Sequence, residues 1–219
     1  MRILITAGNT FAPIDRVRGI TNIFTGKTGA LIALTAETFG HEVTLLTSHP
    51  KALPEADGIP NLHTFHTFDD LETLLAEHVQ RGAYDAIVHA AAVSDYQVAG
   101  AFDARQKALD HGGKIKSDEE ELWLKLVRAP KLIDRMRTDW GFKGILVKFK
   151  LEVGIDDAEL LKIAEASRQQ SRANFMVANT LEGASQWAYL GPLAGKYERV
   201  TRAELPKRLL AVITEAHRG

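Results

Sequence analysis

The stretch MRILITAGNT, residues 1–10, sets the fold of this chain. Its apolar run at residues 3–6 ends at the small residues Ala7 and Gly8, a pattern typical of a strand that is buried on both faces. Similar runs, each bounded by turn residues, recur at 43–47, 86–93, 145–151 and 175–178. We therefore expect a sheet built from these buried strands.

Segments with helical spacing of apolar residues fill the intervals between the strands. They cover residues 27–39, 69–80 and 156–172, so strand and helix alternate along the chain. Parallel strands require crossover connections, and the alternation therefore predicts an α/β fold, a Rossmann-like, mostly parallel sheet with helices on both faces. The last third adds a small strand pair at 187–190 and 196–201, followed by a closing helix at 202–217.

Two connections are longer than this alternation requires. Residues 8–26 separate the first strand from the first helix, where a simple connection takes about 2–6 residues, so we expect this segment to be functional. Residues 97–121 are polar, mixed in charge and contain Gly112-Gly113. We expect them to form a mobile flap within a single domain that spans residues 1–219.

The composition excludes several classes of protein. The chain has 219 residues, no cysteine, and 27 basic against 28 acidic residues, which gives a net charge of -1. Disulfides, thiolate catalysis and cysteine-bound zinc are excluded, and no general attraction to nucleic acid or anionic lipid is expected. No apolar run approaches the ~20 residues that span a bilayer. The first residues lack a signal-peptide pattern, so we expect a cytoplasmic location.

The common nucleotide-binding and catalytic fingerprints are missing. No two glycines are two residues apart, and no tyrosine is followed four positions later by lysine, which disfavours an NAD(P)-dependent oxidoreductase. Gly26-Lys27-Thr28 resembles the end of a Walker P-loop, but Thr21 stands where its first glycine belongs. No serine lies in a nucleophile elbow. His63 and His66 lack a third placed ligand, so we expect no metal held by the protein alone.

Small residues around the end of the first strand and the start of the first helix suggest an anion site. They form Thr6-Ala7-Gly8-Asn9-Thr10 and Thr25-Gly26-Lys27-Thr28-Gly29. A helix N-terminus offers unpaired N–H groups and the positive end of a dipole, and small residues allow a phosphate to approach the backbone. The same residues also suit a tight turn and an ordinary glycine-rich helix start, and both interpretations stay open.

Four blocks in order make the sequence resemble the phosphopantothenate-cysteine ligases. The first block joins the two glycine-containing segments to PIDRVR at 13–18 and ITN at 20–22, and the others are AAAVSDY at 90–96, KIK at 114–116 and FMVAN at 175–179. The resemblance covers nearly the whole chain. Residues 149–152, FKLE, resemble the stand-alone ligases more than those fused to a decarboxylase, which implies a monofunctional ligase.

The resemblance implies that 4'-phosphopantothenate and cysteine are joined in coenzyme A biosynthesis. CTP or ATP activates the carboxylate as an acyl nucleotide, with Mg²⁺ accompanying the nucleotide, and the protein is expected to be a homodimer. Three phosphates, a phosphomonoester and a carboxylate then converge on one site, which must supply cations and N–H donors. A non-catalytic nucleotide-binding paralogue is the alternative.

The resemblance also implies site residues. Asn22 is expected to orient the carboxylate and the acyl intermediate, and Lys114 to bring a cation on the flap. Arg16 is a further candidate cation. The residues expected to bind substrate or nucleotide are Gly8, Asn9, Thr10, Asp15, Arg18, Gly26, Lys27, Ala91, Ala92, Asp95, Lys116, Phe149, Arg168, Arg172 and Asn179.

Two departures from the fused enzymes stand out. Those enzymes carry a lysine pair, thought to hold the triphosphate, in the helix before the Val-Ala-Asn block, and residues 166–172 here read ASRQQSR. Arg168 and Arg172 lie four residues apart on one helical face and could substitute, or could be plain surface charge. Lys148 replaces a glycine of the fused enzymes, which puts the local loop geometry in doubt.

Overall fold

A computed structural model describes residues 1–110, 112–118 and 120–219. Its main sheet has eight strands in the order β13-β12-β11-β10-β6-β1-β4-β5. The six strands from β11 to β5 are parallel, and β12 and β13 add an antiparallel edge. The strands are β1 (Arg2–Ala7), β4 (Glu42–Thr47), β5 (Asn61–Thr64), β6 (Ala86–His89), β10 (Ile145–Glu152), β11 (Phe175–Thr180), β12 (Trp187–Leu193) and β13 (Lys196–Thr201).

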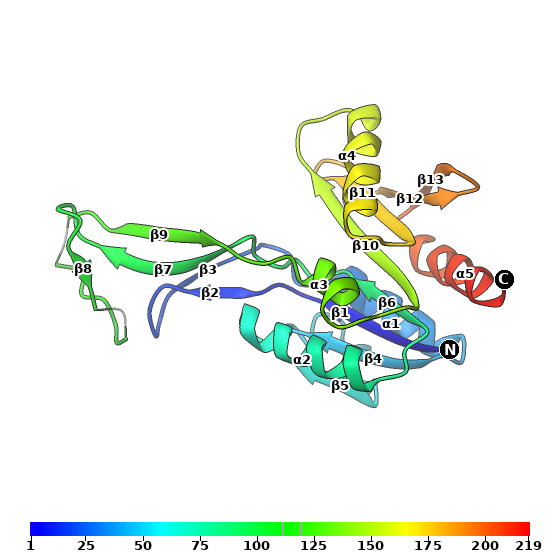
Figure 1. Ribbon diagram of the computed structural model, residues 1–219, viewed down its shortest axis with the longest axis horizontal. Helices are drawn as coiled ribbons and strands as arrows, with labels where there is room; N and C mark the ends of the chain where they lie inside the picture. The colour runs from blue at the N-terminus through cyan, green and yellow to red at the C-terminus, as the bar shows by residue number, and fades with distance from the viewer. Residues whose placement is uncertain (111, 119) are drawn as a thin grey trace.

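Helices cover both faces of this sheet (Figure 1). On one face α1 (Lys27–Thr38) and α5 (Leu205–Arg218) pack on the odd-numbered side chains of β1, such as Ile3 and Ile5. On the other face α2 (Phe68–Arg81) and α3 (Leu132–Thr138) pack on Leu4 and its neighbours. α4 (Asp157–Gln170) contacts Met176 and Ala178 of β11. The predicted α/β fold with helices on both faces is confirmed.

Helix α2 shows how local sequence fixes one of these elements. Thr67 caps its N-terminus, and Asp70 completes a capping box. Leu71, Leu75 and Val79 follow at helical spacing, and all three are buried against the sheet. Burial of a leucine of this kind contributes about 1.5–3 kcal/mol of transfer free energy. The amphipathic spacing therefore orients the helix as well as forming it.

The strand order creates a crevice at one end of the sheet. From β1 the chain runs outward to β4 and β5, and it then returns to β6 on the other side of β1 before continuing to β10 and β11. Connections that leave two adjacent parallel strands in opposite directions open a space beyond their carboxyl ends. The switch point between β1 and β6 is therefore the expected place for a ligand.

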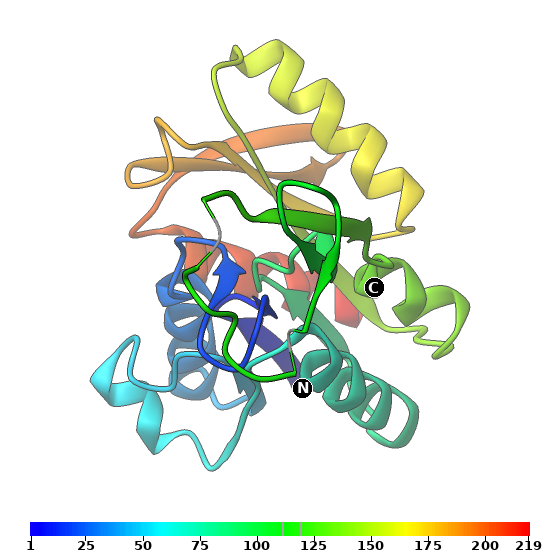
Figure 2. The ribbon, with the colours of Figure 1, turned by 90° about the vertical axis from the view of Figure 1, so that its left-hand side faces the viewer.

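Two groups of strands project from this end of the sheet and form what we call the arm (Figures 1 and 2). The hairpin of β2 (Phe11–Pro13) and β3 (Gly19–Thr21) is one part. The other is a three-stranded antiparallel sheet of β7 (Tyr96–Phe102), β8 (Ala108–Leu109) and β9 (Trp123–Arg128). The arm accounts for the long connection at residues 8–26.

Part of the predicted flap at 97–121 forms the strands β7 and β8. Most side chains of β7 and β9 are exposed or only partly buried, so neither strand shows the clean alternation that marks a core strand. His111 and Glu119 lie outside the described residues, and the mobility of the flap stays a prediction.

Other boundaries also differ from the sequence-based expectation. β6 ends at His89 instead of residue 93, and residues 90–95 leave the sheet to line the crevice. β5 and α3 were not predicted; β5 lies at the sheet edge with little burial, and α3 has seven residues. Among the described residues, none of the helices is long and apolar enough to cross a bilayer.

Candidate active site

A cavity of about 970 Å³ occupies the crevice, bounded by the carboxyl ends of β1, β6, β10 and β11 and by the start of α1. Its lining combines segments far apart in the sequence. The predicted site residues that line it are Gly8, Asn22, Gly26, Lys27, Ala91, Ala92, Asp95, Phe149 and Asn179.

Two glycines let the start of α1 approach the end of β1. Gly26 has φ 81°, and a Cβ there would lie 2.0 Å from the backbone nitrogen of Gly8. Gly8 has φ 88°, and its Cβ would lie 2.2 Å from Oγ of Ser48. None of the side chains that the structure describes caps the N-terminus of α1, so its first N–H groups are available to an anion. The geometry favours the anion site over the ordinary turn.

Two hydrogen bonds, one from its side chain and one to its backbone, hold Asn22 at the cavity wall. Its side-chain Nδ2 donates to the carbonyl oxygen of Ala92 at 2.9 Å, and its backbone carbonyl oxygen accepts from Nδ2 of Asn9 at 2.5 Å. Asn9 and Thr10 are buried and do not line the cavity. Thr10 Oγ1 accepts from the backbone N–H of Ser94 at 2.8 Å. Asn9 and Thr10 therefore position the wall of the cavity.

A row of polar side chains crosses the sheet at its carboxyl end. Thr6 of β1, His89 of β6 and Lys148 of β10 share one register line. Thr6 Oγ1 lies 3.0 Å from Nδ1 of His89 and accepts from the N–H of Ala91 at 3.1 Å. Burial, reinforced by the charge of Lys148, lowers the pKa of His89 to about 4. The ring is therefore neutral near pH 7.

Lys148 of β10 also lines the cavity. Its Nζ donates to the carbonyl oxygen of Ser167 at 3.1 Å and to Oγ of Ser171 at 2.5 Å, both on α4 or its C-terminal cap. Burial is the main cause that lowers its pKa. The sequence marked Lys148 only as a departure from related enzymes, because register alone does not show that it faces a cavity.

The charge of the lining is strongly asymmetric. In the described part of the chain, six cationic residues line the cavity, against the two acidic residues Asp95 and Asp134. Lys131 pairs with Asp95, and Lys150 pairs with Glu152 at 2.8 Å. The cations with no carboxylate partner among the described residues are Lys27, Arg128, Lys148 and Arg202. This excess of positive charge suits a polyanionic ligand.

The sequence patterns also did not predict Arg202 and Lys131 as site residues. The guanidinium of Arg202 donates to Oγ1 of Thr28 in the first turn of α1. Arg202 follows β13, and Lys131 precedes α3, so both reach the cavity only because distant elements converge there. Neither residue lies in a segment whose sequence indicates ligand binding.

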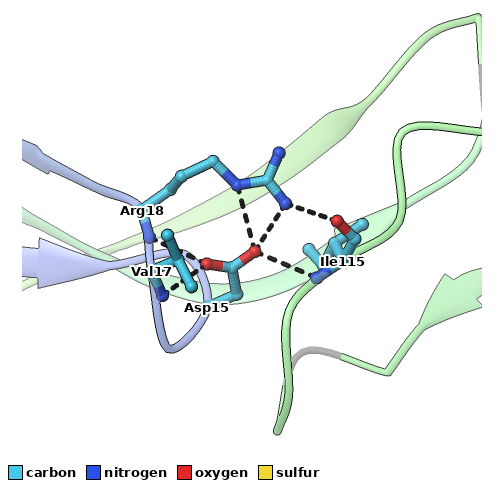
Figure 3. Close-up of polar contacts among 4 residues, drawn as sticks. All are labelled: Asp15, Val17, Arg18 and Ile115. Carbon is cyan, nitrogen blue, oxygen red and sulfur yellow. Dashed lines mark hydrogen bonds and ion pairs between the residues drawn. The ribbon is translucent and has the colours of Figure 1, made fainter.

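Asp15 and Arg18 lie in the arm and do not line the cavity (Figure 3). The buried Asp15 carboxylate accepts from the Arg18 guanidinium at 2.6 Å and from the backbone N–H groups of Val17, Arg18 and Ile115 at 2.8, 2.8 and 3.0 Å. The Arg18 guanidinium holds the pKa of this carboxyl well below its usual range. The observed contacts of Asp15 join the β2-β3 hairpin to the loop before β9.

The lysines of the KIK block lie near this contact. Lys114 and Lys116 are exposed on either side of the buried Ile115, and neither lines the cavity. The backbone N–H of Arg16 donates to the carbonyl oxygen of Gly113 at 3.1 Å. The arm therefore holds these cations outside the cavity described here.

The structure places Arg168 in contacts within the fold and Arg172 at the surface. The Arg168 guanidinium donates to both oxygens of Glu165 at 2.6 and 2.8 Å and to the carbonyl oxygen of Ala173 at 2.7 Å. Arg172 is exposed, with φ 51°, just past the end of α4. Neither residue lines the cavity. The four-residue spacing of Arg168 and Arg172 did not reveal that Glu165 binds the Arg168 guanidinium.

Comparisons with known proteins agree with this architecture. Residues 1–189 match the DNA/pantothenate metabolism flavoprotein C-terminal domain family. A coenzyme A biosynthesis bifunctional protein CoaBC from Thermococcus kodakarensis is 34% identical over 213 residues, covering 95% of this chain and 49% of that protein. The chain thus spans about half the length of the curated relatives it matches.

Two solved structures are also similar. The DNA/pantothenate metabolism flavoprotein from Streptococcus pneumoniae has a TM-score of 0.83 and 29% identity, covering 99% of this chain and 100% of that one. A Cab2 mutant in complex with phosphopantothenate-cysteine has a TM-score of 0.75 and 18% identity, covering 99% and 86% of the two chains, and it shows the shared fold. From its matched residues and fold, the chain belongs to the DNA/pantothenate metabolism flavoprotein C-terminal domain family.

Proposed function

We propose that this chain joins 4'-phosphopantothenate to cysteine, using CTP or ATP to form an acyl-nucleotide intermediate, in coenzyme A biosynthesis. The observation that carries the proposal is the cavity at the β1-β6 switch point, where four cations without carboxylate partners and an uncapped helix start face the same space. The sequence blocks of the family and the relationship to CoaBC proteins support it.

The chemistry explains why such a charge excess is needed. A carboxylate resists attack by an amine, so a carboxylate oxygen first attacks the α-phosphorus of the nucleotide, and the bond from that phosphorus to pyrophosphate breaks. The cysteine amine then attacks the carbonyl carbon, and the nucleoside monophosphate leaves. Two like charges 4 Å apart repel by about 4 kcal/mol at an effective dielectric constant of 20. Cations and N–H donors must offset several such repulsions between the negative charges of the substrates.

Different residues of this chain bind the different anionic groups. The start of α1, with Lys27 and Arg202, binds phosphate oxygens, since N–H groups and cations meet there. Asn22 holds the reacting carboxylate and then the acyl carbonyl, because a hydrogen bond to the Ala92 carbonyl oxygen fixes its side-chain amide at the wall. The backbone at Ala91 and Ala92 and the side chain of Asn179 surround the nucleotide.

Magnesium fits this site as part of the nucleotide complex. Among the described residues, no group of three His, Asp or Glu side chains could hold a metal ion, and Asp95 and Asp134 are the acidic residues in the lining. Mg²⁺ commonly binds through one or two carboxylates together with substrate phosphates and waters. When bound, it would neutralise phosphate charge, and Asp134 offers a buried Oδ1 that has no hydrogen-bond partner in the described structure.

The arm supports a homodimer as part of the same proposal. Large apolar side chains that are exposed on or beside it are Val17, Ile20, Ile23, Phe24, Tyr96, Leu122, Trp123, Leu126 and Val127. A concentration of exposed apolar residues of this kind marks an interaction surface. A second copy would cover it, and Lys114 would act where the flap of either copy closes on a cavity. A cytoplasmic location belongs to this proposal as well.

Pyrophosphate release tests the proposal. The purified chain is incubated with Mg²⁺, phosphopantothenate, cysteine and either CTP or ATP, and pyrophosphate and the cysteine conjugate are both measured. We expect pyrophosphate release that requires phosphopantothenate and product formation that also requires cysteine. Nucleotide binding without either product would instead identify the non-catalytic paralogue.

A further inference from the structure

We propose that Lys148 forms a phosphate subsite in the cavity, and that it takes the terminal phosphates of the nucleotide. This inference rests on the proposed function. It assigns a binding role to a side chain that reaches the cavity from the sheet, whereas the start of α1 contributes the other anion-binding groups.

The geometry leaves one donor of Lys148 free. An ammonium group has three N–H donors. Two are used by the carbonyl oxygen of Ser167 and Oγ of Ser171, and these contacts hold the nitrogen against the C-terminal end of α4. The Ser171 side chain is itself buried, which makes the anchor rigid. The remaining donor is therefore available to a ligand in the cavity that Lys148 lines.

The charges around Lys148 favour an anion there. Lys148 has no ion-pair partner among the described residues, although it is partly buried. Lys131 and Lys150 repel it, while Asp134 attracts it without an ion-pair contact. His89, its neighbour on the register line, is uncharged near pH 7. It therefore does not neutralise the charge of Lys148, which stays available to an anion. A buried cation without a carboxylate partner is costly, and a bound phosphate would offset this cost.

Lys148 suits the terminal phosphates better than the other candidate cations do. Arg168 is held by Glu165, and Arg172 lies outside the cavity, so neither residue that the sequence favoured for this role is available. Lys131 and Lys150 each have a carboxylate partner. Of the four described cations in the lining without a carboxylate partner, Lys148 is the one on the main sheet beside α4, whereas Lys27 and Arg202 lie at the start of α1 and Arg128 ends β9 of the arm.

Calorimetric titration tests the subsite. CTP, CMP, inorganic pyrophosphate and phosphopantothenate are each titrated into the parent chain, Lys148→Met and the control Lys143→Met. Lys143 is an exposed lysine just before β10, at the end of the strand opposite the cavity. We expect Lys148→Met to weaken CTP and pyrophosphate at least tenfold and CMP less than threefold, because a charged hydrogen bond to the β or γ phosphate is lost. Lys148→Arg should retain most of the affinity.

The four titrations distinguish the two sources of phosphate, the nucleotide and phosphopantothenate. A tenfold loss confined to phosphopantothenate would keep the phosphate subsite but assign it to that substrate. A loss below threefold for all four ligands, a similar loss for CTP and CMP, or no binding of any of them to the parent would overturn it.

Two further measurements keep the result independent of folding and of the proposed reaction. Thermal unfolding checks each variant, and Ser171→Ala releases Lys148 without removing its charge; unchanged phosphate affinity in Ser171→Ala together with a destabilised Lys148→Met would overturn the subsite. Pyrophosphate binding that depends on Lys148 in a chain without ligase turnover would retain the subsite and refute the proposed function.

Discussion

Asn22 joins the long connection between β1 and α1 to the segment that follows β6, at the cavity wall. Its side chain donates to Ala92, while Asn9 holds its backbone carbonyl. We predict that Asn22→Asp lowers pyrophosphate release about 30- to 1000-fold, because a negative charge next to two anionic reactants removes ~2–4 kcal/mol of transition-state stabilisation. The exposed Asn61→Asp on β5 serves as the control. Activity of Asn22→Asp within threefold of the parent would rule out this role.

His89 gives the fold a pH dependence of defined sign. Burial lowers its folded pKa from 6.5 to about 4, so between these values the unfolded chain binds more protons than the folded chain. Stability therefore rises with pH across this window and is lost as the solution is acidified. We predict that the parent loses about 2 kcal/mol more stability between pH 7 and pH 5 than His89→Gln does.

Urea denaturation at the two pH values measures this difference. The exposed His217→Gln provides the matched control and should keep the dependence of the parent. Other histidines with lowered pKa, His41 and His78, contribute equally to all three chains. A pH dependence in His89→Gln that equals that of the parent would show that His89 is not the cause.

At the scale of elements, the buried strands and long helices were predictable because their apolar spacing reflects a single core. Residues 27–39 and 69–80 match α1 and α2 to within one residue at either end. The arm was not predictable, since β9 and β7 bury few side chains and their pairing depends on contacts between distant segments. For the site, the sequence blocks predicted nine residues of the described lining, while Lys148, Lys131 and Arg202 depended on tertiary arrangement.

Helix α4 illustrates how a predicted ligand residue can be structural. Arg168, 19% exposed, joins Glu165 and the carbonyl oxygen of Ala173, and Tyr197 donates to the same carboxylate at 2.8 Å. Arg168 is the main cause that lowers the pKa of Glu165 to about 2. Glu165 therefore stabilises the fold above pH 4.5, and this contribution is lost as the pH falls towards 2.

We predict that Arg168→Ala destabilises the chain by about 1–2 kcal/mol, because it removes charged hydrogen bonds that are only partly screened. The free energy of unfolding in urea measures the effect, and CTP affinity should change less than threefold. Arg172→Ala, which removes an exposed side chain, should leave both quantities nearly unchanged. A tenfold loss of CTP affinity in Arg168→Ala would instead support its role in holding the triphosphate.

For the whole molecule, the arm is the feature that the main sheet does not explain (Figure 2). Trp123 at the start of β9 is 58% exposed. We predict that Trp123→Asp converts a dimer into a monomer, because a charge would be buried in the apolar interface. Sedimentation measures the mass of the particle. Val153→Asp, at an equally exposed valine outside the arm, is the control and should stay dimeric. A parent that is already monomeric would contradict the dimer.

Helix α5 has a consequence for where this domain can be cut. The family match ends at residue 189, yet Leu205, Leu209 and Ile213 of α5 are fully buried against the sheet. A fragment of residues 1–189 would lose most of β12, leave an open edge along β11 and expose this apolar surface. We predict that it accumulates as insoluble aggregate on expression, whereas residues 1–219 stay in solution, as centrifugation of the lysate would measure. The residues that match the family therefore end before the strand and the helix that complete this sheet and its core.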